Sequence, residues 1–274
     1  MFVIERDKII KKYALLCPTS MGVRLTPADR QPVHRAKSYT MESTSAETNV
    51  LNIPASLGLP TKALTAFVKD SPIGAFIKSE LRARSIDYEG PEIGPDGPWG
   101  VRHQFNLADA GYGLRGPRVY NDRAGEVGRL LEPGFYDMDR LFGEEGCEIL
   151  HISGLIAAMS ETTAELCLAL ARAAKRHGTR VSFDLNYRAS FWQGREKALG
   201  KVFHELAGLA DILVGNEEDF QLALGFPGPE ADGKALSGKL DSYKALITRV
   251  KAVYPGAKQF ATTLRQVEDA NTHR

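Results

Sequence analysis

Two short apolar segments that end abruptly in polar residues constrain the fold of this chain more than any other feature. V-S-F-D-L-N-Y-R occupies residues 181–188, and D-I-L-V-G-N-E-E-D-F occupies residues 211–220. A helical pattern separates them, which predicts neighbouring buried strands of a parallel sheet joined by a crossover helix. Ligands bind at the carboxyl ends of such strands. We therefore expect the polar residues that follow both strands to share one rim: Asp184, Asn186, Arg188, Asn216 and Asp219.

The composition is that of a globular protein without an obvious nucleic-acid or membrane partner. The chain has 274 residues, of which 43% are hydrophobic and 25% are charged, and its net charge is +1. There is no global basic field, no apolar run approaches the roughly 20 residues that span a bilayer, and the charged N-terminus lacks the pattern of a secretory signal. Three cysteines without paired spacing favour a reducing compartment. We expect a cytoplasmic protein of one large or two modest domains, and we expect Cys167 to lie in the core.

Strand and helix patterns alternate along most of the chain, which predicts right-handed βαβ units and a parallel sheet. Pro54 interrupts the helical pattern at 47–57 and predicts a kink or a late helix start there. Ser71 and Ser160 are placed to cap helices. The segment 225–234 is typical of a surface loop. Strands are expected at 13–18, 22–27, 61–68, 147–154, 179–186, 211–216 and 257–264. Helices are expected at 71–85, 47–57, 160–178, around Leu199–Leu206, from 217 to Gly225 and at 241–253.

Residues 90–125 differ from the rest of the chain because glycine and proline are dense there and are followed by alternating segments. This pattern predicts a small β-subdomain inserted into the α/β body, or a mobile lid, with residues of about 20–40 contributing to it. Arg123 follows an alternating strand in this insert, near Tyr112 and Tyr120. Loops held on rigid scaffolds often carry function, although a solvated arginine is the alternative.

The residue types at the two strand ends suit a small polyhydroxylated, acidic ligand. In extended chain Asp184, Asn186 and Arg188 share one face, and arginine grips carboxylate or phosphate groups bidentately. A strand end tied down by local hydrogen bonds is the alternative. The helix dipole explains Glu217 and Glu218, whereas oxygen ligands such as those of Asn216 and Asp219 bind Mg²⁺ through its waters.

Common catalytic and cofactor motifs are missing from the sequence. The six histidines show no metal-ligand spacing, so we expect no direct metal site. No P-loop, no G-x-G-x-x-G opening a helix and no G-x-S-x-G elbow occurs, which argues against P-loop nucleotide binding, a nicotinamide dehydrogenase and an α/β-hydrolase.

Three segments together resemble the ribokinase-like (PfkB) carbohydrate kinases, and most closely the 2-keto-3-deoxygluconate kinases. D-L-N-Y-R resembles the family's sugar-contacting D-x-N-x-R strand. N-E-E-D resembles its N-x-x-E motif, with Asp219 in place of the glutamate. S-A-E-T-N-V resembles its G-G-A-E-A-N-V-A segment, with Asn49 kept and Thr44 and Ser45 in place of the glycines.

The resemblance implies a three-layer α/β domain over residues 1–274 with a small β-sheet lid. It implies ATP- and Mg²⁺-dependent phosphorylation of a sugar or sugar acid, 2-keto-3-deoxygluconate first, with a fructokinase, a ribokinase or a non-catalytic sugar binder as alternatives. Asn216 and Asp219 would organise Mg²⁺ and phosphate. The residues that would hold the sugar are Asn49, Tyr112, Arg123, Asp184, Asn186 and Arg188.

The family's G-A-G-D or G-G-G-D segment, which carries the catalytic aspartate and an anion hole, does not occur in the sequence. We therefore expect a C-terminally truncated chain whose catalytic base lies beyond Arg274, with sugar binding at best and negligible turnover. We also expect that the lid could pair with a second copy of the chain.

Overall fold

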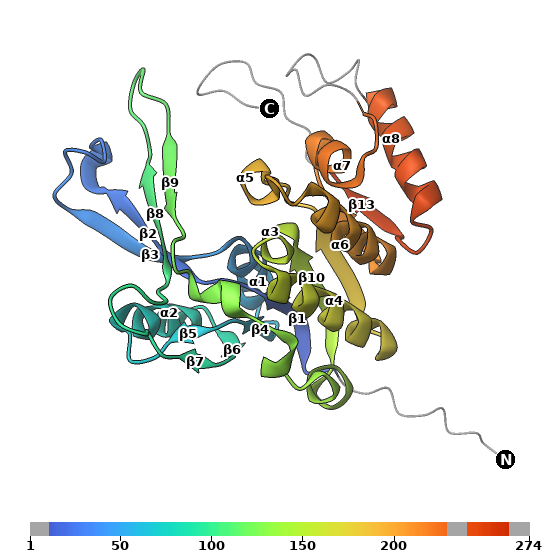
Figure 1. Cartoon of the computed structure of the whole chain (residues 1–274), viewed down its shortest axis with the longest axis horizontal. Helices are drawn as coiled ribbons and strands as arrows, with labels where there is room; N and C mark the ends of the chain where they lie inside the picture. Colours follow the sequence, from blue (N-terminus) through green and yellow to red (C-terminus); the bar gives the residue numbers. More distant parts are fainter. Residues whose placement is uncertain (1–10, 229–239, 263–274) are drawn as a thin grey trace.

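A seven-stranded parallel sheet forms the centre of the molecule in a computed structural model that describes residues 11–228 and 240–262 (Figure 1). Its strands run in the order β13-β12-β11-β10-β1-β4-β6, and all neighbouring strands are parallel. The chain moves outward from β1 to β4 and β6, then returns to β10 and continues to β13. A reversal of this kind opens a crevice at the carboxyl ends of the strands. The expected α/β fold class is confirmed.

The strands of the central sheet are three to seven residues long. They are β1 (Tyr13–Pro18), β4 (Thr61–Leu64), β6 (Ile86–Glu89), β10 (Cys147–Ser153), β11 (Arg180–Asp184), β12 (Ile212–Val214) and β13 (Gln259–Ala261). Six of the predicted strands thus contribute to this sheet, the one predicted at 61–68 only through its first part. Strand β13 is shorter than the predicted 257–264, of which residues 263 and 264 lie outside the described part. Residues 229–234 of the predicted surface loop lie outside it as well.

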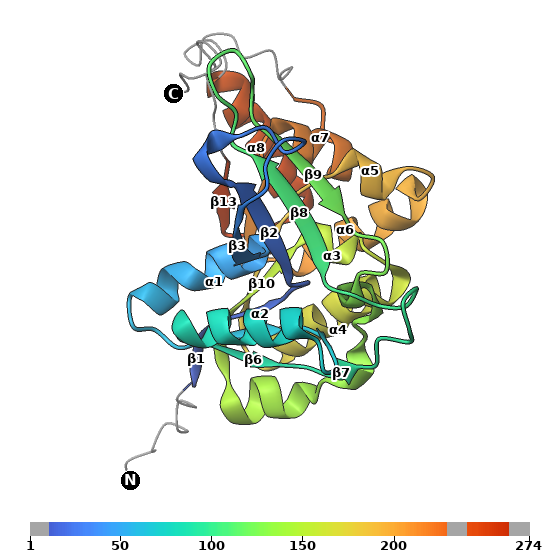
Figure 2. The ribbon, with the colours of Figure 1, turned by 90° about the vertical axis from the view of Figure 1, so that its left-hand side faces the viewer.

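Helices cover both faces of the sheet (Figures 1 and 2). Among the helices of the described residues, none is both long and apolar enough to cross a membrane. The helices are α1 (Ala46–Ser56), α2 (Pro72–Ala83), α3 (Gly154–Ala157), α4 (Glu161–Arg176), α5 (Ala189–Trp192), α6 (Glu196–Leu209), α7 (Glu217–Leu224) and α8 (Leu240–Val253). Short 3₁₀ or π turns lie at Ala28–Arg30, Val127–Leu130, Pro133–Phe135 and Arg140–Glu145.

Capping chemistry sets the ends of several of these helices as the sequence predicts. The Ser71 hydroxyl accepts from the Gly74 N–H at the start of α2, and Ser160 forms a capping box with Thr163 at the start of α4. Each such cap satisfies a backbone donor that has no partner inside the helix. Gly178, with φ +70°, follows the end of α4, a conformation that costs glycine little.

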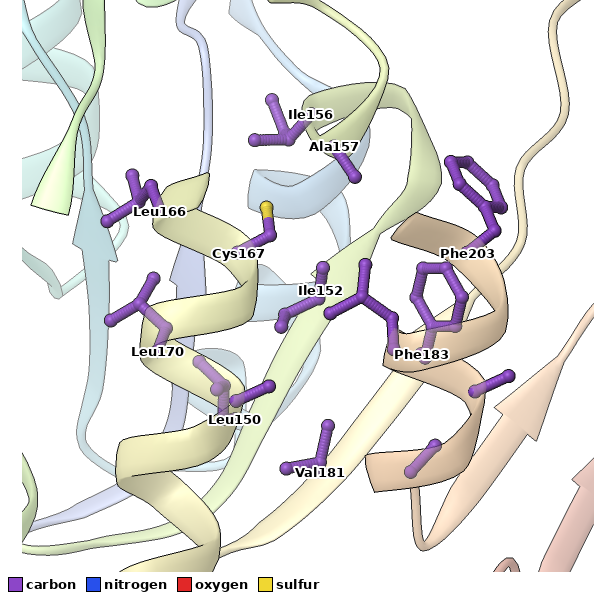
Figure 3. Packing of buried hydrophobic residues seen from close by; sticks show 14 of the residues in the cluster. Leu150, Ile152, Ile156, Ala157, Leu166, Cys167, Leu170, Val181, Phe183 and Phe203 are labelled. Carbon is purple, nitrogen blue, oxygen red and sulfur yellow. The ribbon is translucent and has the colours of Figure 1, made fainter. Parts of the chain in front are cut away.

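The larger of two apolar cores lies between the sheet and helices α4 and α6, and Figure 3 shows part of it. Phe183 of β11 meets Phe203 of α6 edge to face, with ring centroids 5.4 Å apart. Cys167 is fully buried in α4, as expected. Burying a phenylalanine side chain stabilises the fold by about 1.5–3 kcal/mol. Because β11 is packed in this way, its polar end is held in a fixed place.

A second, four-stranded sheet projects from the body in Figures 1 and 2. Its order is β3-β2-β8-β9, so the segment at residues 22–44 pairs with the glycine-rich insert through β2 and β8. A separate two-stranded sheet joins β5 (Phe67–Val68) to β7 (Glu92–Ile93). The four strands of the projecting sheet are β2 (Gly22–Pro27), β3 (Tyr39–Thr44), β8 (Gln104–Asp109) and β9 (Arg118–Asp122).

Two expectations about local structure are wrong. The strand predicted over 61–68 is divided, because β4 pairs with β1 and β6 whereas β5 pairs with β7. The helix with Pro54 does not start late. It begins at Ala46, where the Ser45 hydroxyl accepts from the Thr48 N–H, and Pro54 lies in its last turn, where Leu57 N–H closes the helix on the Pro54 carbonyl.

Gly154, at the start of α3, gives a test of how tightly β10 and β11 are packed. A Cβ atom there would lie 2.1 Å from the Leu185 carbonyl oxygen and 2.7 Å from the Phe203 ring. We expect Gly154→Ala to lower the free energy of unfolding by about 1–3 kcal/mol through overpacking. The control is Gly200→Ala in α6, where a Cβ meets nothing within 4 Å, and it should raise that free energy by about 0.5–1 kcal/mol. Urea denaturation measures both, and equal effects would contradict the packing described.

Candidate active site at the strand ends

The carboxyl ends of β11 and β12 open into one pocket of about 290 Å³. The five polar residues predicted for this rim all line it, together with Thr262, which follows β13. The segment after β11 supplies Asp184, Asn186 and Arg188, and the start of α7 supplies Asn216 and Asp219. The predicted meeting of the two strand ends is therefore observed in the structure.

The Asp219 carboxylate ties the two strand ends together. Its Oδ1 accepts from the Tyr187 N–H at 2.9 Å, and its Oδ2 accepts from the Asn216 N–H at 2.9 Å. The Asn216 side chain in turn accepts from the Asp219 N–H at 2.9 Å, which completes a capping box at the start of α7. A buried carboxylate requires such partners. Its position therefore fixes the segment after β11 relative to α7.

The expectation that Asp184, Asn186 and Arg188 share a face of extended chain is wrong. Strand β11 ends at Asp184, and Asn186 has φ +37°, in the left-handed region. The Asn186 N–H donates to Asp184 Oδ1 at 3.2 Å, and its side-chain amide donates to the Ser153 hydroxyl at 2.9 Å. Local side-chain hydrogen bonds thus replace the strand ladder, which is the alternative that the sequence left open. They turn the chain while keeping the three residues around one pocket.

Asp184 has an altered acidity. Burial, with a smaller contribution from the nearby Asp219 carboxylate, raises its pKa to about 6 from 3.8. A carboxyl group with a pKa near neutrality in a pocket is a common feature of functional sites. At pH 7 the Asp184 carboxylate is available to accept hydrogen bonds from hydroxyl groups.

Glu47 is a residue of this region that the sequence reasoning missed. It lies in the first turn of α1, is 1% exposed and accepts from the Thr19 hydroxyl at 2.8 Å. Burial raises its pKa, and Ser153 and the charge of Arg123 act on the same carboxyl group. Its signal in the sequence was the acidic residue of S-A-E-T-N-V, a segment in which only Asn49 was expected to have a role. Glu47 connects the ends of β1 and β10 behind the pocket.

The three remaining predicted sugar contacts lie outside the 290 Å³ pocket. Arg123 follows β9, and its guanidinium lies over the Phe191 ring of α5, 5.6 Å from the ring centre. Asn49 is exposed on α1. Tyr112 is 69% exposed in the turn between β8 and β9. The structure therefore brings Arg123 to the segment that follows Arg188, and it does not bring Tyr112 there.

A second pocket, of about 660 Å³, lies between the base of the projecting sheet and the start of α4. Glu126 and Arg129 line it from one side, and Ser160 and Arg195 from the other. Arg195 donates to the Ala158 carbonyl at 2.6 Å. Gly125 and Glu126 also line this pocket, and Glu126 is paired with Arg123.

The donor set of the smaller pocket fits a hydrated cation. In the described part of the chain, His, Cys, Asp and Glu side chains form no cluster that could hold a metal ion directly. The Asp219 carboxylate nevertheless contributes to the raised pKa of Asp184, and a divalent cation held through water would offset the negative charge of the pocket. The Thr262 hydroxyl is buried there without a hydrogen-bond partner.

Comparison with known sequences identifies relatives of the chain. Residues 139–254 match the family model of the pfkB family carbohydrate kinases. A 2-dehydro-3-deoxygalactonokinase from Haloferax volcanii is 28% identical over 233 residues, which are 83% of this chain and 68% of the relative. A 5-dehydro-2-deoxygluconokinase from Geobacillus kaustophilus is 27% identical over 235 residues, which are 85% of this chain and 67% of the relative.

Solved structures share the fold. A 2-dehydro-3-deoxygluconokinase from Thermotoga maritima superimposes with a TM-score of 0.82 at 22% identity, over 96% of this chain and 75% of that one. A putative ribokinase II from Escherichia coli, in complex with ATP and Mg²⁺, superimposes with a TM-score of 0.69 at 17% identity, over 91% and 72%. These findings confirm the resemblance seen in the motifs and relate the chain to the pfkB family of carbohydrate kinases, whose ribokinase-like fold it shares.

Proposed function

We propose that this chain carries the sugar site of an ATP-dependent kinase that phosphorylates a hydroxyl group of a sugar acid, with 2-keto-3-deoxygluconate as the favoured substrate. The observation that carries the proposal is the pocket in which the ends of β11 and β12 bring carboxylate, amide and guanidinium groups together. The related kinases named above, which act on deoxy sugar acids by name, support it.

Each polar group of the pocket has a role in this proposal. Asp184 accepts hydrogen bonds from sugar hydroxyls, and Asn186, held by Ser153, presents its amide to them. Arg188 is exposed and donates to the Tyr187 carbonyl at 2.8 Å, which leaves other N–H groups for the substrate carboxylate. Arg123 would complete the site from the projecting sheet. Asn49 and Tyr112, which the resemblance assigns to the sugar, lie outside this pocket.

Phosphoryl transfer depends mostly on positioning and on stabilisation of charge. Mg²⁺, held through water by Asn216 and Asp219, would neutralise charge on the phosphates of ATP. Asp219 positions this end of the pocket through its bonds to two backbone N–H groups. Asp184 would hold the acceptor hydroxyl by accepting a hydrogen bond from it.

Two other functions remain candidates on the same fold. A fructokinase or a ribokinase would bind neutral sugars, and the exposed guanidinium of Arg188 is the feature that favours an acid instead. A non-catalytic sugar-binding protein would bind the ligand without turnover. Thermal shifts with a panel of sugars and sugar acids separate neutral sugars from acids. Sequencing the gene downstream of codon 274 separates the last candidate, because a G-G-G-D segment there supports a kinase.

Location and assembly belong to the proposal too. Three free, buried cysteines agree with a cytoplasmic protein. The outer strands β3 and β9 of the projecting sheet leave side chains exposed along their length, among them Met41, Val119 and Tyr120. Exposed edges of this kind could pair with a second copy of the chain.

The role of Arg188 is tested with two ligands that differ only at C1. 2-Keto-3-deoxygluconate has a carboxylate there, and 3-deoxyfructose has a hydroxymethyl group. We expect Arg188→Ala to weaken binding of the acid about ten- to hundredfold, because a hydrogen bond to a charged group is lost, and to change binding of 3-deoxyfructose little. Calorimetry measures the affinity for both ligands. The control is Arg102→Ala, which removes an exposed arginine paired with Asp122. A similar loss for both ligands would contradict a carboxylate contact.

The raised pKa of Asp184 predicts a pH dependence with a definite sign. Affinity for the sugar acid should fall as pH drops below about 6, because the carboxylate then takes up a proton. In the ligand-free protein the same shift favours folding below pH 3.8, and this contribution is lost as pH rises through 6. Asp184→Asn should therefore flatten the binding profile, and it should raise the free energy of unfolding relative to wild type above pH 6 but not at pH 4. Parallel profiles would refute the role of Asp184.

The expectation of negligible turnover stays a prediction. The sequence holds no G-A-G-D or G-G-G-D segment, to which the resemblance assigns the catalytic base and the anion hole. A coupled assay of the 274-residue chain with ATP, Mg²⁺ and 2-keto-3-deoxygluconate should give no rate above the background without protein. An ordinary kinase rate would show that residues within the chain supply both functions.

A further inference from the structure

Arg123 is held on two sides at the base of the projecting sheet. Its Nη1 donates to both carboxylate oxygens of Glu126, at 2.8 and 2.9 Å. Its guanidinium also lies over the Phe191 ring of α5, a cation–π contact. Phe191 follows Arg188 by three residues, so these contacts place Arg123 beside the segment that lines the sugar pocket.

Glu126 is buried and connects Arg123 to the central sheet. Its side chain is 1% exposed. Besides Arg123, it accepts from the Ser20 hydroxyl at 2.5 Å, and Ser20 lies just beyond the carboxyl end of β1. A buried carboxylate is costly unless it is paired and hydrogen-bonded, and these two partners provide both.

The backbone around Glu126 leaves little room for movement. Gly125 has φ +64°, and a Cβ on it would lie 2.7 Å from the Gly100 carbonyl oxygen. Arg102 donates its N–H to the Gly125 carbonyl at 2.8 Å, and its own carbonyl accepts from the Val127 N–H at 2.9 Å. Glu126 is thus fixed by its main chain as well as by Ser20, and it can fix Arg123.

The pairing also changes what Arg123 offers to a ligand. A carboxylate within hydrogen-bond distance, away from solvent, cancels most of the charge of the guanidinium at longer range. The N–H groups that do not point at Glu126 remain donors. Arg188 differs, because it donates to a backbone carbonyl and has no carboxylate partner within salt-bridge distance in residues 11–228 and 240–262.

We propose that Glu126 is a positioning and specificity-determining residue, which holds Arg123 beside the sugar pocket and cancels its charge. Arg123 then recognises hydroxyl or keto oxygens, and Arg188 alone receives the carboxylate of the acid. This inference rests on the proposed function, because it assigns the two ends of that ligand. It also predicts that the ratio of the affinity for acids to the affinity for neutral sugars is smaller than it would be if both arginines were free of a carboxylate partner.

Glu126→Gln tests the charge. With its amide oxygen in the place of Oε1, glutamine can still accept from Ser20 and Arg123, whereas the contact of Arg123 with Oε2 and the negative charge are lost. We expect the affinity for 2-keto-3-deoxygluconate, relative to that for 3-deoxyfructose, to increase about tenfold, a change that corresponds to about 1.4 kcal/mol. Asp122→Asn is the matched control, because it removes the same charge from an exposed pair with Arg102, and it should leave the ratio unchanged. An unchanged ratio in Glu126→Gln overturns the proposed effect on specificity.

Glu126→Ala tests the position without any sugar. Phenylglyoxal modifies accessible arginines, and mass spectrometry of the digested protein gives the rate at each of them. We expect Arg123 to react slowly in wild type and Glu126→Gln, and about tenfold faster in Glu126→Ala, with the rate at Arg82 as the internal reference. Equal rates at Arg123 in the three proteins overturn the positioning role. If wild type binds neither ligand, the proposed function fails, while these rates still decide whether Glu126 holds Arg123.

Discussion

The Asp219 carboxylate, shared between two backbone N–H groups, is the interaction on which the pocket depends. One N–H belongs to Tyr187 after β11 and the other to Asn216 after β12. Because the strands are parallel neighbours, their ends already point the same way, and this bridge fixes how the segments that follow them approach each other. The same carboxylate disfavours ionisation of Asp184. Burial is the main cause of the raised pKa of Asp184, so the Asp219 carboxylate sets the geometry of the pocket and adds to its altered acidity.

A second set of buried carboxyl groups connects this pocket to the rest of the crevice. Glu47 is bonded to Thr19, and Glu126 is bonded to Ser20, so both residues that follow β1 hold an acidic group. Glu126 holds Arg123, whose guanidinium contacts α5. Glu47 lies near Ser153, which accepts a hydrogen bond from the Asn186 side chain. Three strand ends, β1, β10 and β11, are thus joined through side chains. This arrangement explains how a projecting sheet and a parallel sheet can present groups to one ligand.

The sequence predicted what depends on local pattern. Alternating strands and amphipathic helices, caps at Ser71 and Ser160, and the meeting of Asp184 with Asn216 all follow from periodicity and from the geometry of parallel sheets. It did not predict the left-handed conformation of Asn186, because that depends on a hydroxyl 33 residues away. Glu47 and Glu126 likewise depend on remote partners, Thr19 and Ser20, which lie 28 and 106 residues away. Tyr112 was expected at the sugar because the insert resembles the family's lid, but it lies exposed in the turn between β8 and β9.

A crystal structure of the protein with 2-keto-3-deoxygluconate tests the central claim most directly. The sugar acid should lie at the ends of β11 and β12, with its carboxylate on Arg188 and hydroxyl groups within hydrogen-bond distance of Asp184 and Asn186. Arg123 should remain paired with Glu126 and face the ligand at the other end. A ligand bound instead in the pocket between Arg129 and Arg195, without contact to either strand end, would contradict the account.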